Sequence, residues 1–305
     1  MKNPGWVDLQ VNGHNGIDYT DPNLTAEDFI RSAEELLKTG TDIFCPVIIT
    51  SPLDNVRRNA EIIQSTVEKY GLQAHIPGLH LEGPFISNIP GAVGAHNPDY
   101  TLIPTAENVE KLLAGAPGFI SIVTMGADAP GAPEAVALLK AAGVHVSTGH
   151  HMADYAQVKA MADAGAELLT HLGNGCPNLL DRHCNPVWAG LAEERLTAML
   201  ITDGHHLPAE LVKVLIRSKG ADKVIVTSDA SSPTGLPPGR YETLGGLVAV
   251  LEANGKLHIP ERKCLAGSAS TMSMCMNFLD SLDFLTGDEL RMVGRDNALK
   301  LLGKL

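Results

Sequence analysis

The chain has 305 residues, of which 44% are hydrophobic, so one domain over residues 1–305 can bury a large core. Its formal net charge is −12 at pH 7, which disfavours nucleic acid and anionic membranes as general partners. The five cysteines form no Cys-x-x-Cys pair, as expected for reduced thiols. There is no apolar signal region and no membrane-spanning apolar stretch. We therefore expect a soluble, cytoplasmic protein.

Strand and helix signals alternate along the chain, beginning with a strand at 6–12 and a helix at 25–38 that Thr25 caps. The other predicted strands are 42–50, 76–81, 120–125, 144–148, 167–170, 196–202 and 223–228. The other predicted helices between them are 52–69, 106–113, 132–142, 155–164 and 209–218. Aperiodic loops at 85–104 and 173–189 interrupt the pattern. Eight such units predict an α/β fold, a (β/α)8 TIM-type barrel.

The pattern changes after the eighth strand. Residues 241–259 alternate apolar and polar side chains around Asn254-Gly255, which predicts a β-hairpin with a two-residue turn. Two closing helices are predicted at 271–285 and 287–302.

Polar side chains end four of the predicted strands: Glu82, His150, His171 and Asp229. The C-terminal strand ends of a parallel barrel converge on one mouth, so these residues can meet around one substrate. One Glu and two His form a three-ligand set that leaves a divalent metal with an open position for water. Asp229 can then carry a proton, so the sequence predicts a metal-dependent hydrolase.

Any single histidine is more often a surface or core residue than a metal ligand, and the chain has twelve. His151 and His205 each adjoin a candidate site histidine and are read as structural. Arg182 and His183 are the best cations near the mouth for an anionic group, although a solvated surface role is a comparable alternative.

Eight short motifs are distributed over nearly the whole chain. They are VDLQVNG (7–13), GLHLEGPF (78–85), AHNP (95–98), STGH (147–150), THLGN (170–174), DGHH (203–206), SDASSPTG (228–235) and LAGS (265–268). Together they resemble the N-acetylglucosamine-6-phosphate deacetylase family of the amidohydrolase superfamily. The resemblance implies that Glu82, His150 and His171 bind the metal and that Asp229 is the general base and acid. It further implies that His96, Asn174, Gly175 and His206 contact the sugar.

Three departures from the family pattern refine this reading. Gln10 and Asn12 stand where many amidohydrolases have two metal-binding histidines. Because neutral amides are poor metal ligands, we expect one metal ion per chain. Zn²⁺ is the first candidate, and Fe²⁺ or another divalent ion is the alternative. The family's small β-sandwich is expected to be absent. The loop at 89–96 carries no Lys, so Arg182, reaching across a homodimer interface, is the leading candidate for a phosphate contact.

The predicted reaction is deacetylation of an N-acetylated amino sugar, N-acetylglucosamine 6-phosphate foremost, to the amino sugar and acetate. This small molecule and a second copy of the chain are the expected partners. The alternatives are another N-acetylhexosamine or a non-phosphorylated sugar, another amide or a deamination, and a silent barrel that only binds.

Overall fold

A parallel barrel lies at the centre of the computed structural model, which describes residues 5–243 and 247–305. Its eight strands, in hydrogen-bonded order, are β1 (Trp6–Val11), β4 (Thr41–Ile49), β5 (Leu79–Glu82), β6 (Ile120–Met125), β7 (His145–Thr148), β8 (Leu168–Leu169), β9 (Thr197–Ile201) and β10 (Val224–Thr227). Val11 bridges to Ala230, which follows β10 and brings the two ends of the sheet together. The predicted TIM-type barrel is confirmed.

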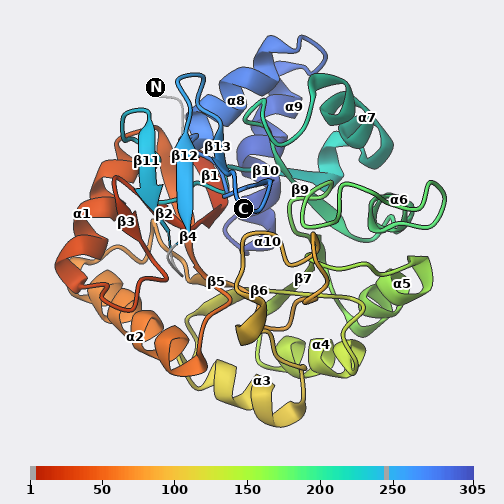
Figure 1. Ribbon diagram of the computed structural model, residues 1–305, viewed down its shortest axis with the longest axis horizontal. Helices are drawn as coiled ribbons and strands as arrows, with labels where there is room; N and C mark the ends of the chain where they lie inside the picture. The colour runs from red at the N-terminus through yellow and green to blue at the C-terminus, as the bar shows by residue number, and fades with distance from the viewer. Residues whose placement is uncertain (1–4, 244–246) are drawn as a thin grey trace.

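Helices form a ring around the strands (Figure 1). They are α1 (Ala26–Leu37), α2 (Leu53–Tyr70), α3 (Ala106–Leu113), α4 (Ala132–Ala141), α5 (Tyr155–Ala164), α6 (Pro186–Ala192), α7 (Ala209–Lys219) and α8 (Met272–Ser281), with single 3₁₀ turns at Pro98–Tyr100 and Ala221–Lys223. Their ends follow local chemistry. The Thr25 side chain accepts from the N–H of Asp28, and Asp154 and Gln157 form a capping box. Gly71, in the left-handed conformation, ends α2.

The barrel interior is filled by apolar side chains, so it is a core and not a pore. Residues from the barrel strands form one buried cluster with the last helix: Val7, Leu9, Ile43, Cys45, Ile122, Leu168, Met199, Ile225, Ala298 and Leu299. A larger cluster lies between the strands and the surrounding helices. With one end of the barrel packed in this way, polar side chains gather at the C-terminal strand ends.

The predicted hairpin is part of a four-stranded antiparallel sheet, β11 (Gly239–Glu242), β12 (Val248–Leu251), β13 (Leu257–Ile259) and β14 (Cys264–Leu265). The prediction of a two-residue turn is wrong. The N–H of Glu252 donates to the Lys256 carbonyl at 2.9 Å, which leaves the three-residue loop 253–255. Gly255 has φ +91°, which suits the positive-φ position of such a loop.

Two further elements depart from the predicted pattern. α6 begins inside the predicted loop 173–189, because the Asn185 side chain accepts from Val187 and Trp188 N–H and Pro186 fits the first helical turn. A short hairpin, β2 (Gly13–His14) with β3 (Ile17–Asp18), follows β1.

The last predicted helix, 287–302, is divided into α9 (Gly287–Arg291), a π-helical turn (Met292–Asp296) and α10 (Asn297–Leu301). Gly294 lies in that turn, where a Cβ atom would come within 2.8 Å of both Trp6 and Met276. Close packing against these side chains therefore accompanies the irregular turn. Among residues 5–243 and 247–305, no helix is long and apolar enough to cross a membrane.

Candidate active site

The candidate site residues sit at strand ends with unusual backbone geometry. His150, His171 and Asp229 have φ of 51°, 30° and 52°, and they are half of the six non-glycine residues with positive φ in the described chain. Glu82 is the last residue of β5, and Gly83 after it has φ 90°. A non-glycine residue in this conformation costs about 1–3 kcal/mol and is tolerated mainly at functional sites. The backbone is thus strained where the four side chains meet.

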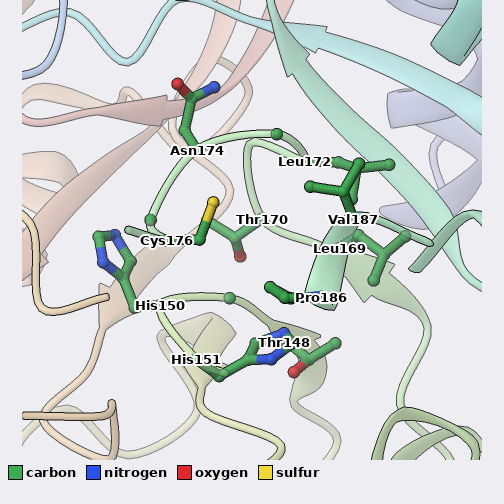
Figure 2. Close-up of a pocket in the computed structure, with 13 residues that line it drawn as sticks. Thr148, His150, His151, Leu169, Thr170, Leu172, Asn174, Cys176, Pro186 and Val187 are labelled. Atoms are coloured by element: carbon green, nitrogen blue, oxygen red, sulfur yellow. The ribbon is translucent and has the colours of Figure 1, made fainter. Parts of the chain in front are cut away.

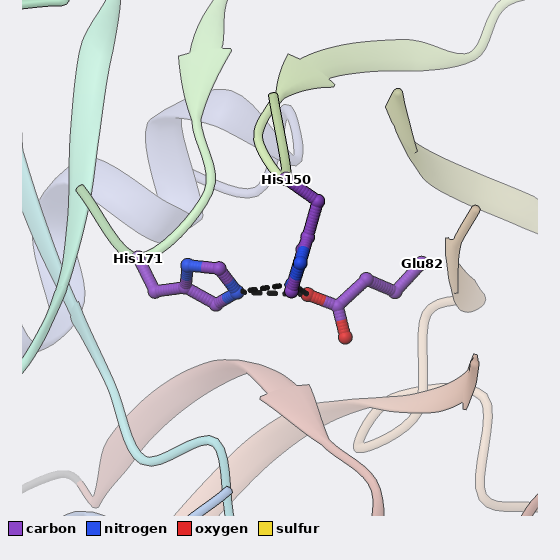
Figure 3. Close-up of side chains that lie close together, drawn as sticks. All are labelled: Glu82, His150 and His171. Atoms are coloured by element: carbon purple, nitrogen blue, oxygen red, sulfur yellow. Dashed lines mark hydrogen bonds and ion pairs between the residues drawn. The ribbon is translucent and has the colours of Figure 1, made fainter. Parts of the chain in front are cut away.

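Glu82, His150 and His171 form a buried triangle (Figure 3). The Nε2 atom of His171 lies 3.0 Å from Glu82 Oε1 and 3.0 Å from His150 Nε2, and His150 Nε2 lies 3.2 Å from Glu82 Oε1. Their ligand-capable atoms all lie within 4.8 Å of one another. A carboxylate with two imidazoles is a donor set typical of catalytic Zn²⁺.

The protonation state of His150 fits a metal ligand. Its Nδ1 lies 2.7 Å from the carbonyl oxygen of Ala92, which only accepts, so Nδ1 carries the proton and the lone pair of the neutral ring is on Nε2. That lone pair faces His171 Nε2 and the Glu82 carboxylate. A cation between these three electron-rich atoms would relieve their repulsion, so the residues fit the metal predicted from the sequence.

Glu82 keeps its negative charge although it is buried. Burial alone would raise the pKa of Glu82, but the adjacent imidazoles of His150 and His171 outweigh it and hold this pKa well below its ordinary value. Glu82 is therefore ionised in this buried place, as a ligand must be.

Asp229 is held by two amides, one on β1 and one directly after it. Its Oδ1 accepts from Asn12 Nδ2 at 2.7 Å and from Gln10 Nε2 at 3.1 Å, and the same Gln10 nitrogen donates to Glu82 Oε1 at 3.0 Å. No hydrogen bond from the described residues reaches Oδ2. Burial raises the pKa of Asp229 to about 6, and the Glu82 charge adds to the shift.

A second buried carboxylate fixes the strand end that carries Asp229. Asp8, fully buried in β1, accepts from the Thr227 hydroxyl at 2.7 Å and from the Ser228 hydroxyl and N–H at 2.5 and 3.1 Å. Burial raises the pKa of Asp8 despite these bonds. β1 and β10 are thereby tied together directly beneath Asp229.

His206 is oriented by its neighbour Asp203. The ring Nδ1 lies 2.8 Å from Asp203 Oδ2, so Nδ1 carries a proton and Nε2 is left for another partner. His96 comes from the loop after β5, and its Nε2 lies 3.7 Å from Glu82 Oε2. Its ring packs edge-on against His150, and burial lowers the pKa of His96 to about 3.

The turn after β8 brings Asn174 and Gly175 to the same place. Gly175 has φ 61°, and a Cβ atom there would lie 3.1 Å from the His171 ring and 3.2 Å from His150, so glycine alone fits without strain. Arg182, further along this loop, is exposed and does not line the cavity over the site.

His151 points in a different direction from His150 (Figure 2). Its Nδ1 accepts from the N–H of Ala153 at 3.1 Å, and it borders a small cavity of about 20 Å³ together with Thr148 and Pro186. This geometry agrees with a structural role for His151.

A cavity of about 1190 Å³ opens over the metal-capable triangle. It is lined by the candidate residues Glu82, His96, His150, His171, Asn174, Gly175, His206 and Asp229. It is also lined by residues of the antiparallel sheet, including Lys256, Arg262 and Lys263. The barrel mouth and this sheet therefore enclose one space, large enough for a sugar phosphate.

Sequence reasoning did not identify five contributors. Asp203 belongs to the DGHH motif but had no predicted role, and Asp8 carried no signal beyond an acidic residue in a strand. Gln10 and Asn12 were recognised as poor metal ligands, but not as donors to Asp229. The Ala92 carbonyl that fixes His150 is a backbone group, which residue types do not reveal.

The fold and this group of side chains define a class, the metal-dependent hydrolases built on a parallel barrel. The chain is 31% identical over 304 residues to the N-acetylglucosamine-6-phosphate deacetylase of Lysinibacillus sphaericus, an alignment that covers 99% of this chain and 77% of that protein. The chain therefore belongs to the N-acetylglucosamine-6-phosphate deacetylase family.

Other similarities point the same way. The N-acetylgalactosamine-6-phosphate deacetylase of Escherichia coli O157:H7 is 28% identical over 98% of this chain and 78% of its own length. An N-acetyl-D-glucosamine-6-phosphate deacetylase variant from Mycobacterium smegmatis, solved with N-acetyl-D-glucosamine-6-phosphate, superimposes with a TM-score of 0.88 at 27% identity, covering 98% of this chain and 77% of that one. No family model matches the chain.

Proposed function

We propose that this chain is a metal-dependent deacetylase that hydrolyses N-acetylglucosamine 6-phosphate to the amino sugar phosphate and acetate, with residues 1–305 acting as one hydrolase unit. The convergence of Glu82, His150 and His171 beside Asp229 carries the proposal. The names of the relatives supply the substrate. N-acetylgalactosamine 6-phosphate is the second candidate, because one similar protein bears that name. The homodimer and the cytoplasmic location stay predictions.

Glu82, His150 and His171 would hold one divalent ion, Zn²⁺ foremost and Fe²⁺ as the alternative, because carboxylate and imidazole ligands suit both. When bound, such an ion supplies Lewis-acid chemistry, since it makes water more acidic and polarises an amide carbonyl. Gln10 and Asn12 would not hold a second ion, because neutral amide oxygens are poor ligands for a transition metal. Their amide nitrogens instead donate to the carboxylates of Asp229 and Glu82.

Asp229 would move the proton that amide hydrolysis requires. Two amides occupy Oδ1, so Oδ2 would accept the proton of the attacking water and return it to the leaving nitrogen. The amine is too basic to leave without that proton.

The remaining candidates would bind the substrate. With Nδ1 bound to Asp203, His206 would offer Nε2 to a substrate oxygen. His96, Asn174 and Gly175 line the same cavity and would contact the sugar. Arg182 would reach a phosphate only from a neighbouring copy of the chain.

A panel of N-acetylhexosamines, with and without a 6-phosphate, tests the function when acetate and ammonia are both measured. Acetate release from N-acetylglucosamine 6-phosphate at the highest kcat/KM supports the proposal. A preference for N-acetylgalactosamine 6-phosphate would favour the second candidate. Ammonia as the product would instead establish a deaminase.

A further inference from the structure

A row of hydrogen-bonded side chains crosses the barrel interior beneath the metal-capable triangle. It consists of His80 in β5, Thr124 in β6, Ser147 in β7 and Thr170, which directly follows β8. All four are buried, with at most 2% of each residue exposed. His80 and Thr170 belong to the motifs GLHLEGPF and THLGN but have no role in the proposed reaction. We refer to these four residues as the buried polar chain.

The direction of each hydrogen bond in the buried polar chain follows from its end at His80. The ring Nδ1 lies 2.8 Å from the carbonyl oxygen of Leu9, which only accepts, so Nδ1 carries the proton. Full burial favours the neutral ring, so Nε2 accepts from the Thr124 hydroxyl at 2.7 Å. Because a hydroxyl has one proton, Thr170 donates to Thr124 at 2.6 Å and Ser147 donates to Thr170 at 2.5 Å. All four bonds therefore point the same way, from β7 towards β1, and each strengthens the next.

Thr170 contacts the backbone segments that carry both histidine ligands. It directly precedes His171, whose φ of 30° is strained. Its own N–H donates to the Thr148 carbonyl at 2.9 Å. A Cβ atom on Gly149 would lie 2.7 Å from the Thr170 Cβ, so Thr170 packs closely against the residue that precedes His150. A shift of Thr170 would therefore move the backbone at both ligands.

The other end of the buried polar chain lies beneath the third ligand. His80 and Glu82 are two residues apart in β5, so their side chains lie on the same face of the strand. The carbonyl of Leu9, which accepts from His80, directly precedes Gln10, and the Gln10 amide donates to Glu82 Oε1 at 3.0 Å. One continuous row of hydrogen bonds thus joins the strand ends that carry all three metal-capable side chains.

We propose that Thr170 is a positioning residue for the metal site and acts through the buried polar chain. Strained backbone persists only where the surrounding structure holds it, and the two hydrogen bonds of the Thr170 hydroxyl hold the segment that carries His171. Without that hydroxyl, His171 can relax away from the position in which its Nε2 meets the other two ligand atoms. The inference rests on the proposed metal-dependent function and deepens it, because it names a residue that governs metal affinity without binding the metal or the substrate.

The test compares the loss of two buried threonine hydroxyls. Thr170→Val nearly keeps the shape of the side chain and removes its hydroxyl, and Thr170→Ser retains the hydroxyl. Thr66→Val is the control, because Thr66 is equally buried and its hydroxyl donates to the Ile62 carbonyl within α2, at 2.7 Å. Thr170→Val should weaken Zn²⁺ binding, measured by competition with a chelator, by about tenfold or more. Thr170→Ser and Thr66→Val should stay within about threefold of the wild type.

The visible absorption spectrum of the Co²⁺-loaded protein reports the ligand geometry directly. This spectrum should change in Thr170→Val and should be that of the wild type in Thr66→Val. KM for N-acetylglucosamine 6-phosphate, measured at saturating metal, should change less than about twofold in Thr170→Val, because the residues that would bind the substrate stay in place.

Equal Zn²⁺ affinity in Thr170→Val and Thr66→Val would overturn the positioning role, as would a loss in Thr170→Ser as large as that in Thr170→Val. If Thr170→Val does not fold, Ser147→Ala takes its place. It removes the first donor of the buried polar chain and should weaken Zn²⁺ binding about threefold or more, and an affinity equal to that of Thr66→Val would refute the role.

The outcome for the wild type separates this inference from the proposed function. A wild type that binds Zn²⁺ but releases no acetate contradicts only the deacetylase function, and the comparison of Zn²⁺ affinities still decides the role of Thr170. A wild type that binds no divalent ion refutes both the metal site and its positioning by Thr170.

Discussion

At the scale of single residues, the chemistry depends on how neighbours hold a few side chains. Glu82, His150, His171 and Asp229 could be predicted, because metal-capable and acidic residue types at strand ends mark a barrel mouth. The groups that orient site histidines could not, because the Ala92 carbonyl beside His150 and Asp203 beside His206 are recognisable as partners only in three dimensions.

Asp229→Asn should retain the metal and the fold but lose roughly 10²-fold or more in kcat, because the swap keeps the shape and removes the proton-accepting charge. Asp283→Asn is the matched control, since Asp283 is exposed and has φ 51°, nearly that of Asp229. Steady-state acetate release with metal analysis measures both. Turnover near that of the wild type in Asp229→Asn would show that another residue is the base.

Asn12→Ala should lower kcat by about tenfold with little change in KM, because Asn12 orients Asp229 through Oδ1 and the substrate-binding residues stay in place. Asn23→Ala, at an exposed asparagine that bonds only to Asp21 among the described residues, is the control. A rise in KM with unchanged kcat would contradict this positioning role.

At the scale of elements, hydrophobic periodicity gave the alternation of strands and helices, since each element has one buried face. This periodicity did not reveal β11 or β14, because both strands are short and are defined by their pairing with β12 and β13. α6 was missed because its seven residues are too short for a periodic signal, although Asn185-Pro186 marks its start.

The turn at Gly175 provides a prediction at this scale. Gly175→Ala should lower metal affinity by at least tenfold, because its Cβ would press on His171 and His150 at 3.1 and 3.2 Å. Gly71→Ala is the control, because Gly71 has a similar φ of 68° and its added Cβ would meet nothing within 4 Å. This variant should lose only the stability that an alanine with positive φ costs, about 1 kcal/mol. Equal metal affinity in the two variants would show that the close approach has no consequence.

At the scale of the whole molecule, the pH dependence of stability includes a contribution from Asp18, a partly buried carboxylate that lines the cavity. Burial raises the pKa of Asp18 from 3.8 to about 6. Between about pH 4 and 6, Asp18 is therefore ionised in the unfolded chain but still protonated in the folded chain. As the pH rises through this range, Asp18 lowers the free energy of unfolding, and the loss is complete above about pH 6.

Asp18→Asn, which keeps an oxygen for the N–H of Thr20, should therefore be more stable than the wild type at pH 7, by up to about 3 kcal/mol, and this advantage should vanish near pH 4. Urea unfolding at several pH values measures the difference. A difference in the free energy of unfolding between the two proteins that does not change with pH would mean that Asp18 has an ordinary pKa.

Metal content and acetate release, measured on the same protein, test the proposed metal-dependent deacetylation. The wild type should bind one divalent ion per chain and release one acetate per N-acetylglucosamine 6-phosphate consumed. His171→Ala should lose the ion and the activity together, because the ligand set is incomplete. Acetate release by the wild type that survives full removal of the metal, or that persists in His171→Ala, would contradict a metal-dependent mechanism at this site.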